Sequence, residues 1–208
     1  MTVTVRKATS GDIETVVATH LRAFQGFFLT MLGPRFLRRL YSAFLDEPTG
    51  ILLVGEYGSA VSGFVAGTTN PQGFFRRLLA RQGAGLALSA VPALLRNPHR
   101  VGQRLLAAVT YRGEPPATRP DAALLSSIAV DPEISGRGLA GELLEGFVTA
   151  AGRSGCQAVY LTTDRDDNVP VRNFYERNGF RAEDLIVRDG RRSMVRYVRE
   201  IGQALEHR

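Results

Sequence analysis

The stretch that decides the fold is Val130-Asp131-Pro132-Glu133-Ile134-Ser135-Gly136-Arg137-Gly138-Leu139-Ala140-Gly141. It follows an apolar run over 124–130, which is typical of a buried strand, and leads into apolar residues at helical spacing over 139–151. Gly136 and Gly138 permit backbone conformations that other residues avoid, and they let a ligand approach the main chain closely. Consecutive amides at the start of the helix would bind an anion such as a pyrophosphate, and Arg137 would add a positive charge. An ordinary tight turn between a strand and a helix has the same glycine spacing, so both interpretations stay open here.

A second pattern lies downstream of this turn. The alternating residues 156–163 predict another strand. Asn168 is placed to cap a short helix that has Pro170 in its first turn. Asn178-Gly179 predicts the end of that helix, because glycine readily adopts the left-handed conformation found at helix ends.

The remaining regular elements follow from local periodicity. Apolar residues at helical spacing predict helices over 13–24 and 36–44. Asp189-Gly190 is the strongest hairpin signal in the chain. Strand patterns occur over 2–8, 51–56, 61–68, 180–187 and 193–198.

Residues 70–120 differ from the segments on either side. A short amphipathic helix is expected over 74–81, the segment 83–95 is small and apolar, and 100–111 is again helical. Residues 113–120 have the composition of a loop. We interpret the block as a helical insertion in a sheet domain.

The composition is that of an ordinary globular protein. Its 208 residues are 44% apolar and 22% charged, which is enough to bury a real core. The single cysteine, Cys156, excludes an intrachain disulfide, and with no secretion signal it favours a reducing cytoplasm. We expect no membrane span, since no stretch of about 18 uncharged apolar residues occurs. No metal site is expected either, because the cysteine joins no ligand cluster and the three histidines lie far apart, at His20, His99 and His207.

The charge is basic and consists almost entirely of arginine. The formal net charge is +6, and Lys7 is the only lysine. A high isoelectric point admits nucleic acid, an acidic membrane surface or a phosphorylated ligand as partner. Because no run of five basic residues occurs, charges dispersed over a solvated surface explain the composition as well. Nucleic acid is therefore not the expected partner.

The glycine-rich stretch resembles the acyl-CoA-binding motif of the GNAT acyltransferase superfamily. That motif reads Val-x-Pro-x-x-(Arg/Gln)-Gly-x-Gly-(Ile/Leu)-(Gly/Ala) and is followed by a leucine-rich helix. Ser135 stands where the family usually has Arg or Gln, which removes one side chain but keeps the backbone amides. The matching residues are Val130, Pro132, Gly136, Gly138, Leu139, Ala140, Leu143 and Leu144.

The downstream pattern strengthens the resemblance. Residues 168–180 resemble the family's Asn-x-x-Ala-x-x-Phe-Tyr-x-x-x-Gly-Phe, with Val171 in place of the common Ala. The resemblance is strong over 124–182, weaker over 1–68 and absent over the insertion. It identifies no subfamily.

The resemblance implies an α/β fold of the GNAT type, with a central mixed twisted sheet flanked by helices. Residues 1–208 would form one acyltransferase domain, and the insertion at about 70–120 would lie on the acceptor side or act as a lid. Two neighbouring parallel strands, 124–130 and 156–163, would part so that the pantetheine arm of acetyl-CoA enters between them. Backbone groups of 128–130 would pair with this arm, and amides of 135–140 would hold the pyrophosphate. The cofactor-binding residues expected from the resemblance are Ile128, Ala129, Val130, Ser135, Gly136, Arg137, Gly138, Leu139, Ala140, Gly141, Asn168 and Phe174.

The chemistry implied by the resemblance needs no enzyme nucleophile, because an amine attacks a thioester directly. Cys156 is therefore expected to be a buried strand residue and not an acyl carrier. Tyr175 would lie near the thioester sulfur and act as general acid toward the leaving thiolate. The general base that would deprotonate the amine is not evident. Glu56, Asp121 and His20 are candidates by position, whereas serines 126 and 127 are poor bases. A chain of water molecules to bulk solvent would remove the proton equally well.

The acceptor site is expected between the first two helices and the insertion. His20, Phe24, Phe27 and Phe28 are the candidates to line it, together with Met31, although these residues would equally well pack the helix pair. Arginines in the insertion would hold a phosphorylated acceptor if they converge, and otherwise form a solvated face. They are Arg76, Arg77, Arg81, Arg96, Arg100 and Arg104. The apolar segment 83–95 fits a lid, a homodimer surface or simple packing.

Two classes of function remain open. The favoured one is an N-acetyltransferase that moves an acetyl group from acetyl-CoA to a primary amine in a ternary complex. A small molecule is the preferred acceptor, such as an amino sugar or a nucleotide-linked amino sugar, and a protein N-terminus or lysine is the rival. The other class is a non-catalytic CoA-binding regulatory module.

Overall fold

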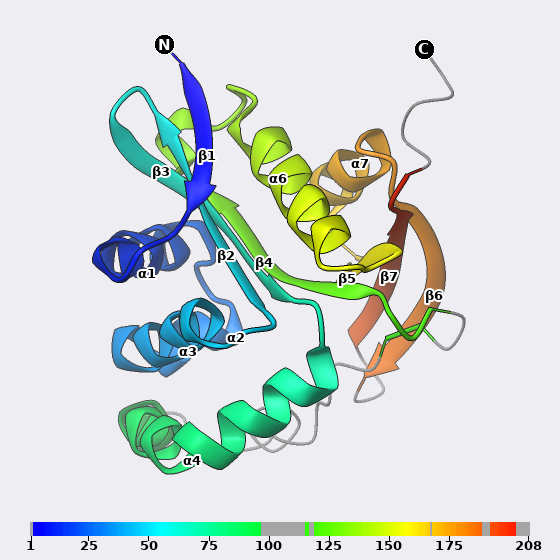
Figure 1. The fold of residues 1–208 in the computed structure, drawn as a ribbon. Helices are drawn as coiled ribbons and strands as arrows, with labels where there is room; N and C mark the ends of the chain where they lie inside the picture. The colour runs from blue at the N-terminus through cyan, green and yellow to red at the C-terminus, as the bar shows by residue number, and fades with distance from the viewer. Residues whose placement is uncertain (1, 97–114, 117–118, 167, 189–191, 203–208) are drawn as a thin grey trace.

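The structure is a computed structural model that describes residues 2–96, 115–116, 119–166, 168–188 and 192–202. Its centre is a seven-stranded sheet with the strand order β1-β2-β3-β4-β5-β7-β6 (Figure 1). Neighbouring strands are antiparallel except β4 and β5, which are parallel. The strands are β1 (Val3–Lys7), β2 (Gly50–Tyr57), β3 (Ala60–Thr68), β4 (Ala123–Val130), β5 (Ala158–Asp164), β6 (Arg181–Arg188) and β7 (Arg192–Glu200). This confirms the predicted mixed α/β fold.

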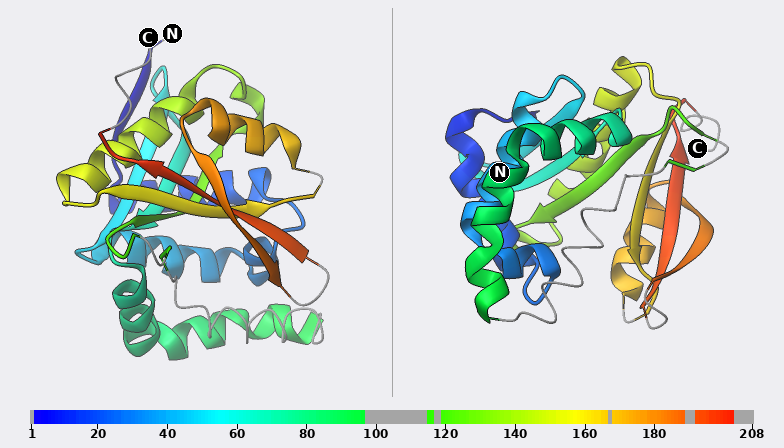
Figure 2. Two further views of the ribbon diagram at one scale, coloured as in Figure 1. Left: turned by 90° about the vertical axis from the view of Figure 1, so that its right-hand side faces the viewer. Right: turned by 90° about the horizontal axis from the view of Figure 1, so that it is seen from below.

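Helices cover both faces of the sheet (Figure 1). The first helices of the chain lie on one face, and α6 and α7 lie on the other. Helix α4 extends beyond α3 at one end of the molecule (Figures 1 and 2). The helices are α1 (Ile13–Ala23), α2 (Phe28–Leu32), α3 (Pro34–Asp46), α4 (Pro71–Arg96), α6 (Leu139–Arg153) and α7 (Val169–Arg177), with short 3-10 turns at Ser10–Asp12 and Pro132–Ile134.

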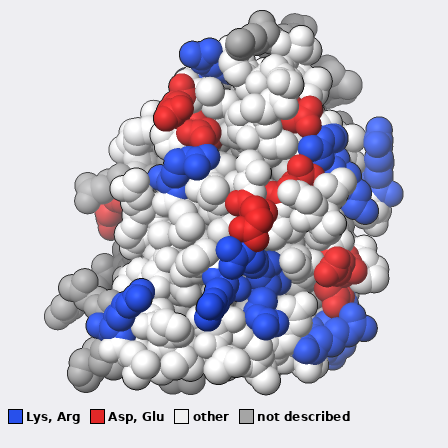
Figure 3. Space-filling view, turned by 90° about the vertical axis from the view of Figure 1, so that its left-hand side faces the viewer, with Lys and Arg blue, Asp and Glu red and all other residues white. Residues whose placement is uncertain are grey.

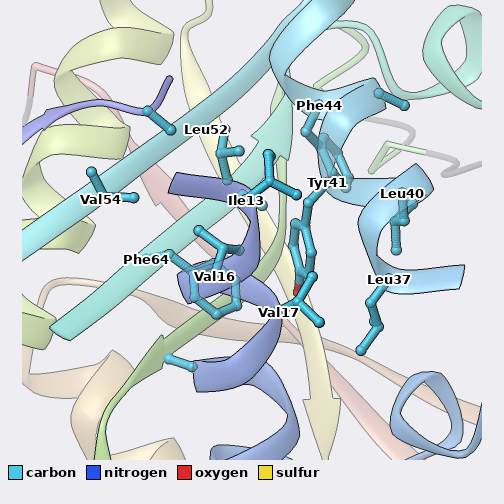
Figure 4. Close-up of a cluster of buried hydrophobic side chains, with 14 of the residues drawn as sticks. Ile13, Val16, Val17, Leu37, Leu40, Tyr41, Phe44, Leu52, Val54 and Phe64 are labelled. Carbon is cyan, nitrogen blue, oxygen red and sulfur yellow. The ribbon is translucent and has the colours of Figure 1, made fainter. Parts of the chain in front are cut away.

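Each face of the sheet has its own hydrophobic core. Under α6, Leu143, Leu144 and Phe147 are fully buried, as the predicted helical stripe requires. On the other face, Tyr41 and Phe44 of α3 pack with α1 and the sheet around Phe64 (Figure 4). Burying a side chain of this size contributes about 1.5–3 kcal/mol, so the two cores fix the sheet between the two helical layers.

The insertion differs from the sequence prediction. One 26-residue helix, α4, replaces the short helix expected over 74–81 and the separate apolar segment 83–95. It includes Pro92, which would be expected to interrupt a helix. Strands β3 and β4 pair directly across the insertion, so the sheet continues through it. The helix expected over 100–111 and the turn at residues 189–190 lie outside the described residues.

Helix α4 is held by charge and by apolar contacts. At the end of α3, the carboxylate of Glu47 is only 7% exposed and accepts hydrogen bonds from Arg77 (2.6 Å) and Arg81 (2.8 Å). Leu86 joins the core under α1 and α3, and Ala90 packs with α2. The first part of the insertion is therefore docked on the protein.

The same helix also has the length and composition of a membrane span. An 18-residue window of α4 reaches a mean hydropathy of 1.4, and 22% of that window is buried. This finding differs from the expectation that the chain has no such segment. The expectation required about 18 apolar residues with no charged side chain, whereas the test met by α4 allows two charged residues in the window. A core helix of a soluble protein passes the same test.

Candidate active site

The sheet opens between its two parallel strands. Strand β4 pairs with β5 only at Ala123↔Val159 and Leu124↔Tyr160. Beyond these pairs β5 stays with β7, β4 stays with β3, and the two strands diverge (Figure 2). Among the described residues, the β5-facing edge of β4 over 125–130 thus has no strand partner. Backbone groups on a free edge can pair with an extended ligand as if it were an added strand.

A bulge in β4 marks the point where the strands part. Ala66 of β3 opposes Ser127, whereas the next residue, Gly67, opposes Leu125. Ser126 is therefore the extra residue, and its side chain is exposed. Sequence reasoning placed both serines on this strand but did not predict the bulge.

The glycine-rich turn presents a row of free amides at the start of α6. Gly136 and Gly138 have φ angles of +81° and +86°, and Gly138 is the N-cap residue of the helix. Ser135 N–H donates to Pro132 C=O (3.3 Å), and Gly141 N–H donates to Gly138 C=O (3.0 Å). The amides of 136–140 between them form no hydrogen bond within the described residues. They are placed to bind an anion with help from the helix dipole, whereas Ser135 N–H is already engaged.

Arg137 does not extend freely from this turn. Its guanidinium lies 5.0 Å from the ring centroid of Tyr57 and donates to the Tyr57 hydroxyl (2.7 Å). Tyr57 belongs to the hairpin of β2 and β3, so it orients the arginine beside the free amides. Local sequence patterns do not indicate this contact, because the two residues are 80 positions apart.

On the other side of the opening, α7 carries the downstream motif. The side-chain amide of Asn168 donates to Thr163 Oγ1 (2.8 Å), which ties the start of α7 to the end of β5. Phe174 packs against the core under α6, and its ring contacts Tyr175. The Tyr175 hydroxyl forms no hydrogen bond within the described part of the chain. Burial raises the pKa of Tyr175 above its ordinary value near 10, so this hydroxyl keeps its proton and can donate it.

A free strand edge beside a row of free amides suits a ligand that has both an extended amide arm and a pyrophosphate, which is the description of a coenzyme A thioester. The family model for the Acetyltransferase (GNAT) family matches residues 19–180. The chain belongs to the GNAT acetyltransferase family. It is an acyl-CoA-dependent N-acetyltransferase, and its acyl donor is acetyl-CoA.

Solved GNAT structures share this fold at low sequence identity. A GNAT-family acetyltransferase from Bacillus cereus is 17% identical, with a TM-score of 0.60 over 96% of this chain and 98% of that one. The ribosomal-protein-S18-alanine N-acetyltransferase from Escherichia coli is 16% identical, with a TM-score of 0.56 over 99% and 100%. The PaiA N-acetyltransferase from Thermoplasma acidophilum, solved with coenzyme A, is 16% identical, with a TM-score of 0.54 over 94% and 98%. No curated protein sequence matches the chain.

The three residues suggested as general bases for this GNAT enzyme, Glu56, Asp121 and His20, lie at three different places in the structure. Glu56 lies on β2 and accepts hydrogen bonds from Arg6 (2.8 Å) and Thr4 (3.2 Å) at the β1 edge of the sheet. Asp121 precedes β4 at the end where β4 and β5 are still paired. His20 is different, because it contacts Tyr41, which in turn neighbours Ser127 on β4.

The four aromatic residues expected at the acceptor site fall into two groups. The Phe24 ring lies 4.7 Å from the His20 ring and 5.6 Å from that of Phe27, which is 48% exposed. Phe28 and Met31 instead pack between α2 and α4. Phe24 thus lies beside the buried His20, and Phe27 lies next to Phe24 at the surface.

The arginines of the insertion do not gather into one free cluster in the described part of the chain. Arg77 and Arg81 pair with Glu47, and Arg76 and Arg96 are exposed. Arg100 and Arg104 lie outside the described residues. On the face formed by α1, α3 and α4, acidic and basic side chains are intermingled (Figure 3). This arrangement fits a solvated surface better than a phosphate-binding one.

Two further expectations concern groups that the reaction does not use. Cys156 is buried, as predicted, but it precedes β5 and does not lie in the strand, and burial raises the pKa of its thiol. Among the described residues no group of three His, Cys, Asp or Glu side chains could hold a metal ion.

Proposed function

We propose that this GNAT enzyme acetylates the primary amine of a small molecule, by direct attack of the amine on acetyl-CoA in a ternary complex. The observation that carries the proposal is the opening after the second β4–β5 residue pair, with the free amides of 136–140 beside it. The free edge of Ile128, Ala129 and Val130 suits the pantetheine arm. The acetyl group would then be held where the two strands part.

The residues beside the opening support direct transfer. The amine forms a bond to the thioester carbonyl carbon, the carbon–sulfur bond breaks, and the sulfur receives a proton. Tyr175 is buried and keeps its proton, and we assign its hydroxyl as the acid that stabilises the leaving thiolate. Cys156 does not compete as an acyl carrier, because the thiolate is the reactive form and burial disfavours it.

Packing on the acceptor side supports a small acceptor. Helices α2 and α4, which the resemblance places around the acceptor, contact each other through Leu32, Ala90 and Ala93. The packing of these two helices against each other is the basis for preferring a small acceptor to an extended peptide. The pairing of Arg77 and Arg81 with Glu47 also removes their charge from phosphate binding. An unphosphorylated amine or amino sugar is therefore preferred over a nucleotide-linked one, and a reducing compartment such as the cytoplasm is the proposed site of action.

The test combines binding with turnover. Purified protein is titrated with coenzyme A and acetyl-CoA by calorimetry, and thiol release from acetyl-CoA is followed with a panel of polyamines, amino sugars, nucleotide-linked amino sugars and peptides. We expect binding of both coenzymes and amine-dependent thiol release that is fastest with an unphosphorylated small amine. Binding without release on any amine would identify a non-catalytic CoA-binding module, and preference for a peptide would identify a protein acetyltransferase.

A further inference from the structure

The core between α1 and α3 contains a polar pair. His20 is 2% exposed and Tyr41 is fully buried, and His20 Nδ1 lies 2.6 Å from the Tyr41 hydroxyl oxygen. Aromatic rings lie beside the His20 ring, at Phe24 and Phe64. Figure 4 shows Tyr41 among the apolar side chains of this core, with Phe64 next to it. A phenylalanine at position 41 would fill the same space without a hydroxyl to satisfy, so packing alone does not account for the pair.

The pair reaches the opening of the sheet through a third group. Ser127 neighbours the Tyr41 hydroxyl and lowers the pKa of Tyr41, which burial otherwise raises, and a hydroxyl that donates to the Tyr41 oxygen has this effect. Ser127 directly follows the bulged residue Ser126, past the last β4–β5 pair. It therefore joins the buried pair to the strand edge at which the acetyl group is expected.

The direction of the hydrogen bonds follows from the state of the histidine. Burial lowers the pKa of His20 to about 4, so the ring is neutral near pH 7 and has one accepting nitrogen. We place the ring proton on Nε2, so that Tyr41 donates to Nδ1, Ser127 donates to Tyr41, and the lone pairs of Ser127 Oγ stay free to accept. The other ring nitrogen, Nε2, is buried and has no partner among the described residues. Such an unsatisfied group carries a desolvation cost, and function is one reason for retaining it.

We propose that Ser127 contacts the attacking amine and that Tyr41 and His20 are positioning residues that hold the Ser127 hydroxyl as an acceptor. This inference rests on the proposed function. One amine N–H donates to Ser127 Oγ, which directs the nitrogen lone pair to the thioester carbonyl. The N–C bond forms and the C–S bond breaks, Tyr175 gives its proton to the coenzyme A sulfur, and the proton lost by nitrogen returns to Tyr175. Neither Ser127 nor the neutral His20 gains a net proton.

The kinetic test uses four substitutions at the three positions Ser127, Tyr41 and His20, one double variant and one control. Ser127→Ala and Tyr41→Phe should each lower kcat/KM for the amine about tenfold, the worth of one hydrogen bond of about 1.4 kcal/mol, with an unchanged Kd for acetyl-CoA. Because they interrupt one chain, the double variant should also lose about tenfold and not about a hundredfold. His20→Asn, whose amide oxygen can replace Nδ1 as acceptor, should retain more activity than His20→Leu. The control is Thr19→Val, since Thr19 is buried on the same helix and its hydroxyl has no partner in the described structure.

The outcomes separate this inference from the proposed function. Activity of Tyr41→Phe within twofold of Thr19→Val, or multiplicative losses in the double variant, would overturn the inference in an active enzyme. Nitrogen NMR of the histidines supplies a readout that needs no turnover: we expect His20 to carry its proton on Nε2 at pH 7, and a proton on Nδ1 would overturn the proposed direction. Acetyl-CoA binding without transfer to any amine would instead overturn the proposed function, together with the role of Ser127 toward an amine.

Discussion

Tyr175 combines a buried ring with a hydroxyl that has no hydrogen-bond partner in the described structure. Tyr175→Phe keeps the packing against Phe180 and Tyr197 and removes only the acid. We expect turnover to fall about a hundredfold, as for the loss of a positioned general acid, while the affinity for acetyl-CoA stays unchanged. Steady-state kinetics and calorimetry measure the two quantities, and unchanged turnover would refute the acid role.

His20 makes stability depend on pH in a defined window. Below its ordinary pKa of 6.5 the residue takes up a proton in the unfolded chain, but in the folded protein burial delays protonation until about pH 4. The free energy of unfolding should therefore fall by about 3 kcal/mol as the pH drops from 6.5 to 4. Urea unfolding across this range checks the prediction.

The comparison protein for this experiment is His20→Asn, which has no group that titrates there. Its stability should fall less than that of the parent between pH 6.5 and 4. Asp12 contributes equally in both proteins, and mainly below pH 4, because Arg6 holds the pKa of its carboxyl below the usual range. Parallel pH profiles for the two proteins would contradict the prediction.

Sequence motifs located Tyr175 but not Tyr41. Tyr175 lies in a contiguous pattern with Asn168 and Phe180, and the resemblance of this pattern to the family motif suggested its role. Tyr41 lies on the apolar face of α3 and resembles any core residue in the sequence. Its contacts with His20 and Ser127 join three separate elements, and local periodicity carries no information about such contacts.

At the scale of one element, the start of α6 combines a backbone conformation that favours glycine with a surface of free amides. Gly138→Ala would place a methyl group at a φ of +86°, which costs about 1–2 kcal/mol of stability, and would set that methyl beside the free amides. We expect coenzyme A affinity to fall at least tenfold, an order-of-magnitude estimate for a ligand held by several amides. Urea unfolding and calorimetry measure the two effects.

Gly58→Ala is the matched control for this substitution. Gly58 has a φ of +68° in the turn between β2 and β3, and an added Cβ has open space there, as it does at Gly138. The two variants should lose similar stability, but only Gly138→Ala should bind coenzyme A more weakly. Equal affinity in both would show that the amides at 136–140 are not the pyrophosphate site.

The elements over 124–180 could be predicted from sequence because each contains its own signals. The glycine turn, the stripe of α6 and the proline in the first turn of α7 are all local. Helix α4 could not be predicted as one element, because Gly83, Gly85 and Pro92 each weaken a helix locally. Its contacts with Glu47 and with α2 lie outside any local window. Tertiary packing therefore overrides the propensity of this segment.

Over the whole molecule, the two halves of the sheet are hydrogen-bonded to each other only through the β4–β5 pairs Ala123↔Val159 and Leu124↔Tyr160 in the described residues. Strands β1 to β4 form one half and β5 to β7 the other, connected by the short parallel pairing and by the core under α6. A ligand that pairs with β4 and contacts α7 would join both halves. At a hundred times its Kd, coenzyme A should add about 2.7 kcal/mol to the stability and raise the Tm by about 5–10 °C.

Amide hydrogen exchange, measured with and without coenzyme A, would locate the residues that the ligand stabilises. Amides of 125–130, of 136–140 and at the start of α7 should exchange more slowly with coenzyme A, whereas β1 at the far edge of the sheet serves as the internal control. Protection spread evenly over the sheet, or no rise in Tm, would contradict a ligand held between β4 and β5.

Because Cys156 is buried, single cysteines can be introduced into this sequence and labelled selectively without first removing the native one. Maleimides and spin labels react with thiolates, and this chain has no second cysteine to compete with an introduced one. Leu88 on α4 and Leu185 on β6 are exposed, so cysteines there would take up dyes first. Energy transfer between dyes at these two positions would measure, in real time, whether the distance between α4 and β6 changes when the donor coenzyme binds and dissociates.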